Sequence, residues 1–345
     1  MDFLFEYGLF LAKAATALIF IILLISTISS ISQRSKREGE DGHVEVTRLH
    51  ERFEDWQDTL NYAVLSEDKY KKLRKDRKKQ EKAERKASKG GAAKKRLFVL
   101  DFDGDIRASA VESLRHEISA ILTVAGEKDE VLLRLESPGG MVHSYGLAAS
   151  QLQRLRDRNI PLTIAIDRVA ASGGYMMACI GNRVLAAPFA VIGSIGVIAQ
   201  LPNFNRLLKK HDIDVELHTA GEFKRTLTMI GENTEEGRKK FLEELEETHT
   251  LFKEFVVEHR PELDIEAIAT GEVWYGRRAL DKGLIDGIST SDDYLLSVRE
   301  SVDIFAVHFK QKRSLPERLG LATEGAVDRG LWRVIDKLRS SRFVG

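Results

Sequence analysis

Short apolar runs alternate with amphipathic stretches in the second and third quarters of the chain. Short continuous apolar runs bounded by turn residues are typical of strands that are buried on both faces. We therefore predict strands at residues 97–102 (LFVLDF), 131–136 (VLLRLE), 161–167 (PLTIAID), 183–188 (RVLAAP) and 214–219 (DVELHT), and a last strand at 303–309. Apolar residues at helical spacing between them predict helices at 109–125, 144–158 and 203–210.

This alternation of strands and helices predicts an α/β domain with mostly parallel pairing and right-handed crossovers. After residue 232 the pattern becomes helical. A long amphipathic helix is expected at 234–258, with Asn233 or Thr234 as its N-cap. Its apolar face is predicted to consist of Phe241, Leu245, Leu251 and Phe255. A second amphipathic helix is expected in the tail, at 323–341.

Residues 8–31 are almost wholly apolar, with ALIFIILLI at their centre. A helix of about 20 residues matches the roughly 30 Å hydrocarbon core of a bilayer. Lys13 lies near the end of the run, where a long side chain reaches the headgroups. A cleaved signal peptide is the alternative, but the chain starts with Asp2 and Glu6 rather than with basic residues. We expect a retained single-pass anchor over residues 1–31.

Charges beside the apolar run bear on its orientation. Arg34, Lys36 and Arg37 follow the run, whereas no lysine or arginine precedes Gly8. The positive-inside rule then favours a cytoplasmic location for the rest of the chain.

Residues 32–96 read as a partly helical spacer. From Lys69 to Arg96 there are 15 Lys/Arg and 3 Asp/Glu. A solvated stalk and a segment that contacts anionic lipid headgroups are both open readings. Nucleic-acid binding is disfavoured, because no aromatic residue interleaves the basic charges after Tyr70.

The amino-acid composition excludes several classes of partner and site. The 345 residues include 53 Lys+Arg and 53 Asp+Glu, so the net charge indicates no polyanionic partner. The single cysteine, Cys179, rules out an intramolecular disulfide and is expected to be an inert core thiol. No His-Glu-x-x-His or comparable spacing is present, so we expect no metal and no cofactor.

Four glycine-containing segments follow the predicted strands. They are Ser137-Pro-Gly-Gly140, Val169-Ala-Ala-Ser-Gly-Gly-Tyr175, Gly193-Ser-Ile-Gly-Val197 and Gly221-Glu-Phe-Lys-Arg225. Each one alone is an ordinary turn or a close packing point. Chemistry in open α/β sheets is placed at strand ends, so their combination in this order indicates a site.

These parts fit acyl transfer. Ser172 would supply a hydroxyl nucleophile once a base takes its proton. The Gly173 amide would lie beside the developing oxyanion, and the flexible Gly139-Gly140 turn would aim a second N–H at it.

The residues leave the identity of the base open. His143 and His218 are the histidines nearest to the motifs, and Asp167 is a candidate partner for one of them. Lys224 is the other candidate, since burial in an apolar pocket lowers a lysine pKa by several units. Phe223 and Leu227 would contribute to such a pocket.

Taken together, the segments ESPGG, AASGGY, GSIGV and GEFKR resemble the motifs of the signal peptide peptidase A family of serine peptidases, in family order. Residues 271–276 (GEVWYG), Ala279 and residues 283–286 (GLID) resemble the closing signature of this family. The apolar N-terminal run and the basic spacer resemble those of its short, membrane-anchored bacterial branch. The resemblance covers most of the chain.

The resemblance implies a Ser–Lys dyad, with Ser172 as nucleophile, Lys224 as general base and Ser194 as the hydroxyl that orients the lysine nitrogen. Gly139 or Gly140, with Gly173, would form the oxyanion hole. It also implies a ClpP/crotonase-type fold of stacked ββα units after a single transmembrane helix. We therefore divide the chain into an anchor (1–31), a spacer (32–96), a peptidase domain (97–309) and a tail (310–345).

The family also implies assembly as a ring or dome of identical subunits, with the serine and lysine of each dyad on adjacent subunits. Peptides associated with the bacterial inner membrane, such as signal-peptide remnants, are the implied substrates. The family's catalytic domain lies outside the cytoplasm, in conflict with the flanking charges. The alternatives are a non-catalytic oligomeric scaffold that binds membrane peptides and a crotonase-like enzyme acting on acyl thioesters.

Overall fold

The structure is a computed structural model that describes residues 42–88, 95–221 and 223–311. The anchor at 1–31 and the tail helix at 323–341 lie outside the described residues. Within the described ranges, no helix has both the length and the apolar character needed to cross a bilayer.

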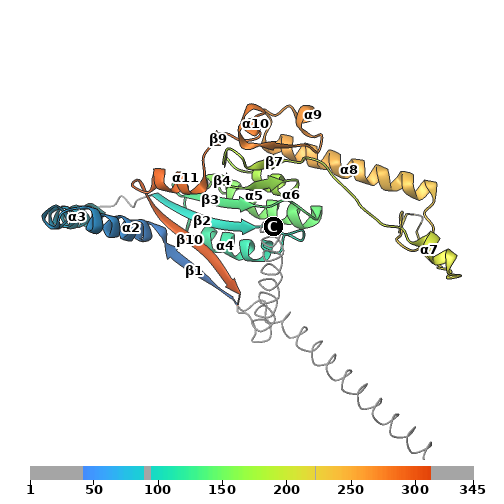
Figure 1. Cartoon of the computed structure of the whole chain (residues 1–345), viewed down its shortest axis with the longest axis horizontal. Coiled ribbons are helices and arrows are strands. Elements are labelled where there is room, and N and C mark those ends of the chain that lie inside the picture. Colours follow the sequence, from blue (N-terminus) through green and yellow to red (C-terminus); the bar gives the residue numbers. More distant parts are fainter. Residues whose placement is uncertain (1–41, 89–94, 222, 312–345) are drawn as a thin grey trace, which may run out of the picture. The chain divides into compact units, whose positions relative to one another are not determined.

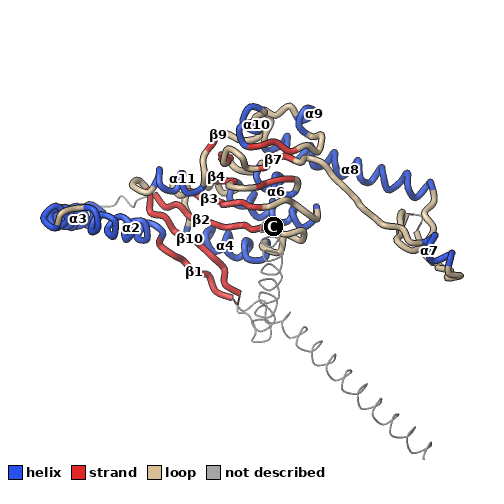
Figure 2. The backbone as a smooth tube through the Cα atoms, viewed as in Figure 1, coloured by secondary structure: helices blue, strands red, loops and turns tan. Residues whose placement is uncertain are grey.

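A seven-stranded sheet is the framework of the fold (Figures 1 and 2). The strand order is β1 (Gly42–Arg48), β10 (Val302–Gln311), β2 (Lys95–Asp103), β3 (Glu130–Glu136), β4 (Leu162–Ile166), β6 (Arg183–Ala186) and β9 (Gly287–Ile288). From β10 to β9, all five neighbouring pairs are parallel.

Alternate residues of these strands enter two different apolar clusters. One face packs against α4 (Val111–Val124), α5 (Val142–Arg156) and α6 (Gly173–Ala178). The other face packs against α11 (Ser291–Val298), with Leu97, Val99 and Leu132 among its strand residues. Burial on both faces explains why the strands have continuous apolar runs in the sequence.

A second sheet of three short strands carries part of the site. Its order is β5 (Val169–Ala171), β7 (Val191–Gly193) and β8 (Val273–Tyr275). The first pair is parallel and the second antiparallel. The remaining short helices are α7 (Asn205–Lys210), α9 (Ile265–Ile268) and α10 (Gly276–Asp281).

The strands predicted at 97–102, 131–136, 161–167, 183–188 and 303–309 are confirmed as β2, β3, β4, β6 and β10. The helices predicted at 109–125, 144–158 and 203–210 are confirmed as α4, α5 and α7. The strand predicted at 214–219 is wrong. These residues are almost all exposed and irregular, because no neighbouring strand lies there to pair with them.

The long helix is confirmed as α8 (Glu235–His259). Thr234 is its N-cap, since the Thr234 hydroxyl accepts a hydrogen bond of 3.0 Å from the Gly237 N–H. Its buried residues are Phe252 and Val256, whereas Leu251 is 59% exposed, contrary to the predicted face. Leu251 is one residue from Phe252, a rotation of about 100° around the helix.

The spacer contains more structure than the sequence indicated. Residues 42–48 form β1, which was not predicted, and the helices α2 (Leu49–Val64) and α3 (Glu67–Ser88) follow. The start of α2 is attached to the domain, because Leu49 and Phe53 pack against the cluster under α11.

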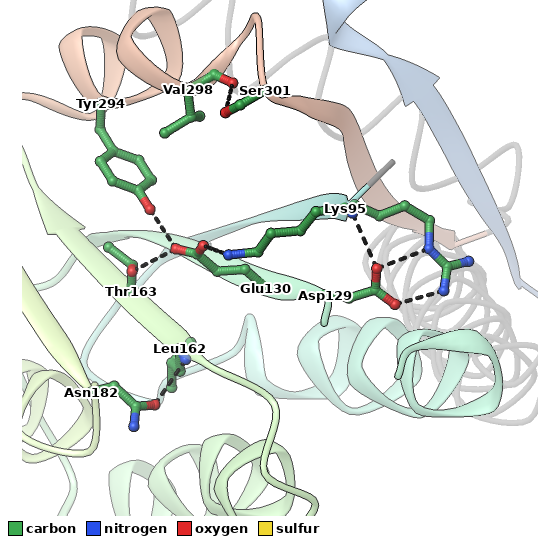
Figure 3. Close-up of polar contacts among 10 residues, drawn as sticks. Lys95, Asp129, Glu130, Leu162, Thr163, Asn182, Tyr294, Val298 and Ser301 are labelled. Atoms are coloured by element: carbon green, nitrogen blue, oxygen red, sulfur yellow. Dashed lines mark hydrogen bonds and ion pairs between the residues drawn. The ribbon is translucent and has the colours of Figure 1, made fainter. Parts of the chain in front are cut away.

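Two neighbouring carboxylates at the start of β3 hold strands together (Figure 3). Glu130 accepts hydrogen bonds from Thr163, Lys95 and Tyr294. Asp129, which is buried, accepts a 2.6 Å hydrogen bond from the Arg96 guanidinium and one of 2.8 Å from the Gly126 N–H. Burial would raise the pKa of Asp129, but these hydrogen bonds outweigh it and hold the pKa below its usual value.

Asp129→Asn is expected to lower the free energy of unfolding at pH 7 by about 1–3 kcal/mol. A carboxyl whose folded pKa is lowered stabilises the fold above the unfolded pKa of about 3.9, and this contribution is lost as the pH falls through the folded pKa. The variant should therefore lose less stability than the parent between pH 5 and pH 3, as measured by urea unfolding. Glu127→Gln, which changes an exposed neighbouring carboxylate, is the control. Equal pH slopes for parent and Asp129→Asn would contradict the prediction.

Candidate active site

Ser172 lies between β5 and α6 in an unusual backbone conformation. Its φ is 52° and its ψ is −120°, a region that non-glycine residues rarely adopt and that costs about 1–3 kcal/mol. The Ser172 N–H donates to the Gly193 carbonyl at 2.8 Å, and the Ser172 carbonyl accepts from the Met176 N–H at 3.0 Å. Neighbouring strand and helix thus hold this serine in its strained turn.

Ser194 is the structural neighbour of Ser172. The parallel pairing of β5 with β7 aligns Ala171 with Gly193, so each serine is the next residue after an aligned pair. Ser194 also has a positive φ, 53°, and its N–H donates to the Glu272 carbonyl at 2.6 Å. The two serines, 22 positions apart in the sequence, therefore follow neighbouring strands of the same sheet.

The Gly139-Gly140 turn after β3 touches the serine turn. Gly139 has a φ of 91°. A Cβ at Gly139 would lie 2.7 Å from the Gly173 nitrogen and 2.8 Å from the Ser172 Cβ. At Gly140 a Cβ would lie 2.1 Å from the Ile106 carbonyl oxygen. Only glycine fits at either position, which explains the paired glycines in the motif.

A buried polar chain supports this turn. The Tyr145 hydroxyl donates to the Asp105 carbonyl at 2.7 Å and lies 2.5 Å from the Ser137 hydroxyl. Ser137 in turn accepts the Gly139 N–H at 3.1 Å. Burial raises the pKa of the Tyr145 phenol, which remains protonated and available as a donor. Ser137 was predicted only as a turn residue, so these hydrogen bonds were not expected from the sequence.

Ser137→Ala is expected to lower kcat of a reaction at Ser172 about tenfold or more, with a smaller effect on KM. The substitution leaves the Gly139 N–H and the Tyr145 hydroxyl without a shared partner, at a cost of about 1–3 kcal/mol in unfolding free energy. Steady-state kinetics and urea unfolding measure the two effects. Ser150→Ala is the matched control, because the Ser150 hydroxyl bonds only within α5, to the Gly146 carbonyl. A Ser137→Ala variant with parental kcat would contradict a supporting role.

Two backbone donors next to Ser172 remain available to a ligand. Gly173 is the first residue of α6, and a helix gives its first N–H groups no intrahelical acceptor. In the described part of the chain, the Gly140 N–H has no hydrogen-bond partner either. The Gly139 N–H, in contrast, is used by Ser137.

A small cavity adjoins Ser172. Its volume is about 10 Å³, room for roughly one water molecule. The cavity is lined by Gly140, Val142, Ser172, Gly173, Met176, Gly196, Val197, Thr248 and Phe252. The last two residues come from α8, which the sequence analysis did not connect with the site.

Lys224 is exposed, and its side chain makes no hydrogen bond to Ser172. The neighbouring Phe223 ring lies 5.7 Å from the Lys240 ammonium, near the start of α8. The cavity beside Ser172 is instead lined by Thr248, about 12 Å further along the helix. Figure 1 shows α7 near the N-terminal end of α8, whereas α6 lies near its C-terminal half.

The other proposed bases make no hydrogen bond to Ser172. His143 is exposed on α5, and the exposed His218 lies 3.3 Å from Glu216. Asp167 accepts hydrogen bonds from the Ser291 N–H and hydroxyl at the start of α11, so its role is structural. Cys179 is fully buried, and burial raises its pKa to about 12, which confirms an unreactive core thiol.

Comparisons with known proteins agree with the motifs. Residues 2–152 match the family model described as peptidase family S49 N-terminal, and residues 154–304 match peptidase family S49. The chain is 51% identical over 332 residues to a probable protease SohB of Haemophilus influenzae, covering 94% of each chain. It is 27% identical over 223 residues to a putative signal peptide peptidase SppA of Enterococcus faecium, covering 61% of this chain and 64% of that protein.

The chain belongs to peptidase family S49. The predicted resemblance to the signal peptide peptidase A family, and within it to the SohB proteins, is confirmed over most of the length. The mixed α/β class is likewise confirmed.

Proposed function

We propose that the chain is a serine endopeptidase in which Ser172 is the nucleophile and Lys224 is the general base. One observation carries this proposal: Ser172 occupies a strained turn beside two available N–H groups, those of Gly140 and Gly173. Strain at a serine next to convergent backbone donors is the arrangement that acyl transfer requires. A peptide-binding scaffold has no need of it.

In the proposed reaction the Ser172 Oγ attacks the peptide carbonyl carbon while its proton passes to the neutral Lys224 amine. The carbonyl oxygen becomes an oxyanion that accepts from the Gly140 and Gly173 N–H groups. Collapse breaks the C–N bond, and the lysine ammonium protonates the leaving amine. Water then attacks the serine ester while Lys224 takes a proton from the water, and the lysine returns this proton to the Ser172 Oγ as the C–O bond to the serine breaks.

We propose that Lys224 reaches Ser172 on a neighbouring subunit. Lys224 is exposed and displaced along α8 in the single chain, which supports this arrangement. Loss of water around the lysine on assembly would favour its neutral form. Ser194, next to Ser172, would then accept a hydrogen bond from the same nitrogen and orient it. An isolated chain would be inactive.

The fold and location complete the proposal. We assign the ClpP/crotonase type from the parallel sheet, the covering helices and the small second sheet, together with the family resemblance. The apolar run at 8–31 would anchor the protein in the bacterial inner membrane. Flanking charge favours a cytoplasmic catalytic domain, whereas the family resemblance favours the opposite side. Protease digestion of sealed vesicles of known orientation distinguishes the two.

The cavity beside Ser172 supports the proposed substrate class. Its volume of about 10 Å³ and its lining by Val142, Met176 and Phe252 favour small apolar side chains. Membrane-associated peptides rich in such residues, including signal-peptide remnants, are the proposed substrates.

Enlarging this cavity is expected to change specificity. Val142→Ala combined with Val197→Ala should raise the kcat/KM ratio of a leucine over an alanine peptide by about tenfold, since one methylene is worth about that factor. Peptide pairs that differ only at the residue before the cleaved bond measure the ratio. Val124→Ala, an exposed position at the end of α4, is the control. An unchanged ratio would place the specificity pocket elsewhere.

The proposal as a whole is tested by assembling the purified full chain in detergent and incubating it with an apolar peptide library. Cleavage that requires Ser172 is expected. Peptide binding without cleavage would indicate the scaffold, and hydrolysis of acyl thioesters but not peptides would indicate the crotonase-like alternative.

A further inference from the structure

The segment after α7 has the pattern of a strand but no strand beside it. Residues 213–218 (IDVELH) alternate strictly between apolar and polar side chains. Strict alternation is typical of a strand with one covered face. The segment is irregular and almost wholly exposed, and within the described residues no backbone hydrogen bond joins residues 214–219 to the rest of the chain. Its backbone groups are therefore open to a partner strand.

The small sheet has an edge that is open in the same way. β8 is its last strand, and only β7 pairs with it. The Glu272 carbonyl faces β7, since it accepts from the Ser194 N–H. Backbone groups alternate in direction along a strand, so the N–H groups of Val273 and Tyr275 point away from β7. Their side chains are 52% and 58% exposed, so this edge can receive a further strand.

The apolar side chains of the segment and of β8 match in an antiparallel pairing. Residues directly opposite each other in paired strands lie on the same face. Placing Leu217 opposite Val273 puts Val215 opposite Tyr275. The exposed Phe189 ring already contacts Tyr275, with 6.2 Å between the ring centroids. The pairing would therefore cover an exposed apolar cluster on β8 with the apolar face of the segment.

Charges favour this register over the alternatives. It places His218 opposite Glu272, and Asp214 near Arg277, just after the end of β8. Parallel registers with two apolar contacts would put an aspartate opposite Glu272. The other antiparallel register with two apolar contacts is shifted by two residues and would put Glu216 opposite Glu272. Like charges directly opposite each other destabilise a strand pair.

The same register directs Lys224 toward the serine turn beside β8. An antiparallel partner of β8 runs in the direction of β7, which ends at Ser194. Leu217 would lie three strand spacings, about 14 Å, from Ala171, the residue before Ser172. The seven residues from Leu217 to Lys224 span up to about 24 Å when extended. The lysine is therefore within reach of this serine.

We propose that residues 213–218 of one chain add as a strand to the β8 edge of a second copy and thereby carry Lys224 to the Ser172 of that copy. This inference rests on the proposed sharing of the dyad between subunits and names the surface that joins them. Each subunit would provide one segment and one edge. Such a head-to-tail contact generates a ring when the rotation closes.

Disulfide formation between copies tests the pairing, because the one native cysteine, Cys179, is fully buried and its pKa is raised to about 12. Full-length Leu217→Cys and Val273→Cys chains are assembled together in detergent and oxidised. Opposite residues of an antiparallel pair have Cα atoms about 4.5–5.5 Å apart, within the range of a disulfide. A cross-linked dimer is therefore expected on a non-reducing gel.

The control for the cross-link is Glu216→Cys assembled with Val273→Cys. Glu216 is also exposed, but its side chain would point to the opposite face of the added strand. The yield of dimer is expected to be about tenfold lower than with Leu217→Cys, because the two Cβ vectors point apart.

Proline substitutions distinguish backbone pairing from a contact of side chains alone. The Val215 N–H would donate to β8, whereas the Glu216 N–H would point to solvent. Val215→Pro in the Leu217→Cys chain is expected to lower the yield of dimer about tenfold. Glu216→Pro in the same chain should retain most of it, since proline is tolerated on an edge strand where its nitrogen faces solvent.

Two results would overturn the proposal. A yield no higher than that of the Glu216→Cys control, in mixed assemblies of verified composition, would show that the two edges do not meet. A disulfide within single chains that carry both Leu217→Cys and Val273→Cys, without joining copies, would show that the segment pairs with its own β8.

These outcomes are separate from those that test the proposed function. Cross-linking is measured without substrate and does not depend on whether Ser172 is the nucleophile. An assembly that fails to cross-link but needs Ser172 and Lys224 for cleavage would overturn the strand pairing alone. An assembly that cross-links as expected while Lys224→Ala keeps parental activity would overturn the assigned base and support the pairing.

Discussion

Ser172→Ala is expected to lower the rate of peptide cleavage by the assembled protein by about 10⁴-fold or more. Removal of the Oγ leaves only binding and the two N–H donors, which cannot form the serine ester. The backbone turn should persist, because it is held by main-chain hydrogen bonds to Gly193 and Met176 that alanine also makes. Size-exclusion chromatography and peptide assays on the same sample measure assembly and activity.

The control for this variant changes a second serine that also lies in a glycine-containing segment. Ser194→Ala, one strand away, should retain a measurable part of the activity, because it removes only a hydrogen bond that orients the lysine. If Ser172→Ala keeps parental activity, or if Ser194→Ala loses more, the nucleophile is misassigned.

Lys224→Ala is expected to reduce cleavage by about 10²–10⁴-fold, the range for a general base. Lys224→Arg should fail equally, because a guanidinium does not give up its proton. Mixing the two inactive variants tests whether the serine and the lysine of one site come from different subunits. If serine and lysine come from different copies, co-assembly of equal amounts of Ser172→Ala and Lys224→Ala chains should restore about a quarter of the parental sites.

Recovery of activity requires exchange of subunits, so the two variant chains are unfolded and reassembled together. Each variant unfolded and reassembled alone is the control. Absence of recovery in mixed assemblies whose composition has been verified would show that the base is on the same chain as Ser172. Parental activity of Lys224→Ala alone would return the role of base to a histidine.

The predicted strands correspond to the parts of the sheet that are buried on both faces. Continuous apolar runs such as LFVL arise there because each residue meets one of two clusters. β5 and β7 were not predicted, since three residues give too little pattern. Residues 214–219 have the composition of a strand. A strand also needs a neighbouring strand as hydrogen-bond partner, and among the described residues none pairs with this segment.

The sequence shows which segments contain glycine beside a serine, but not how these segments meet in the fold. The positions of Ser172, Gly139 and Gly140 are visible because the backbone needs glycine next to the serine turn. The contact between Ser137 and Tyr145 depends on how β3 meets α5, which no local pattern encodes. The choice between the Gly139 and Gly140 amides likewise needed the hydrogen bond from Gly139 to Ser137.

Covalent labelling tests the central assignment most directly. The full chain, assembled in detergent, is treated with a fluorophosphonate, and the modified residue is identified by peptide mass spectrometry. We expect a single adduct on the Ser172 hydroxyl, formed much more slowly in the Lys224→Ala assembly. An assembly that cleaves peptides while Ser172 stays unmodified, or that carries its adduct on another residue, would contradict it.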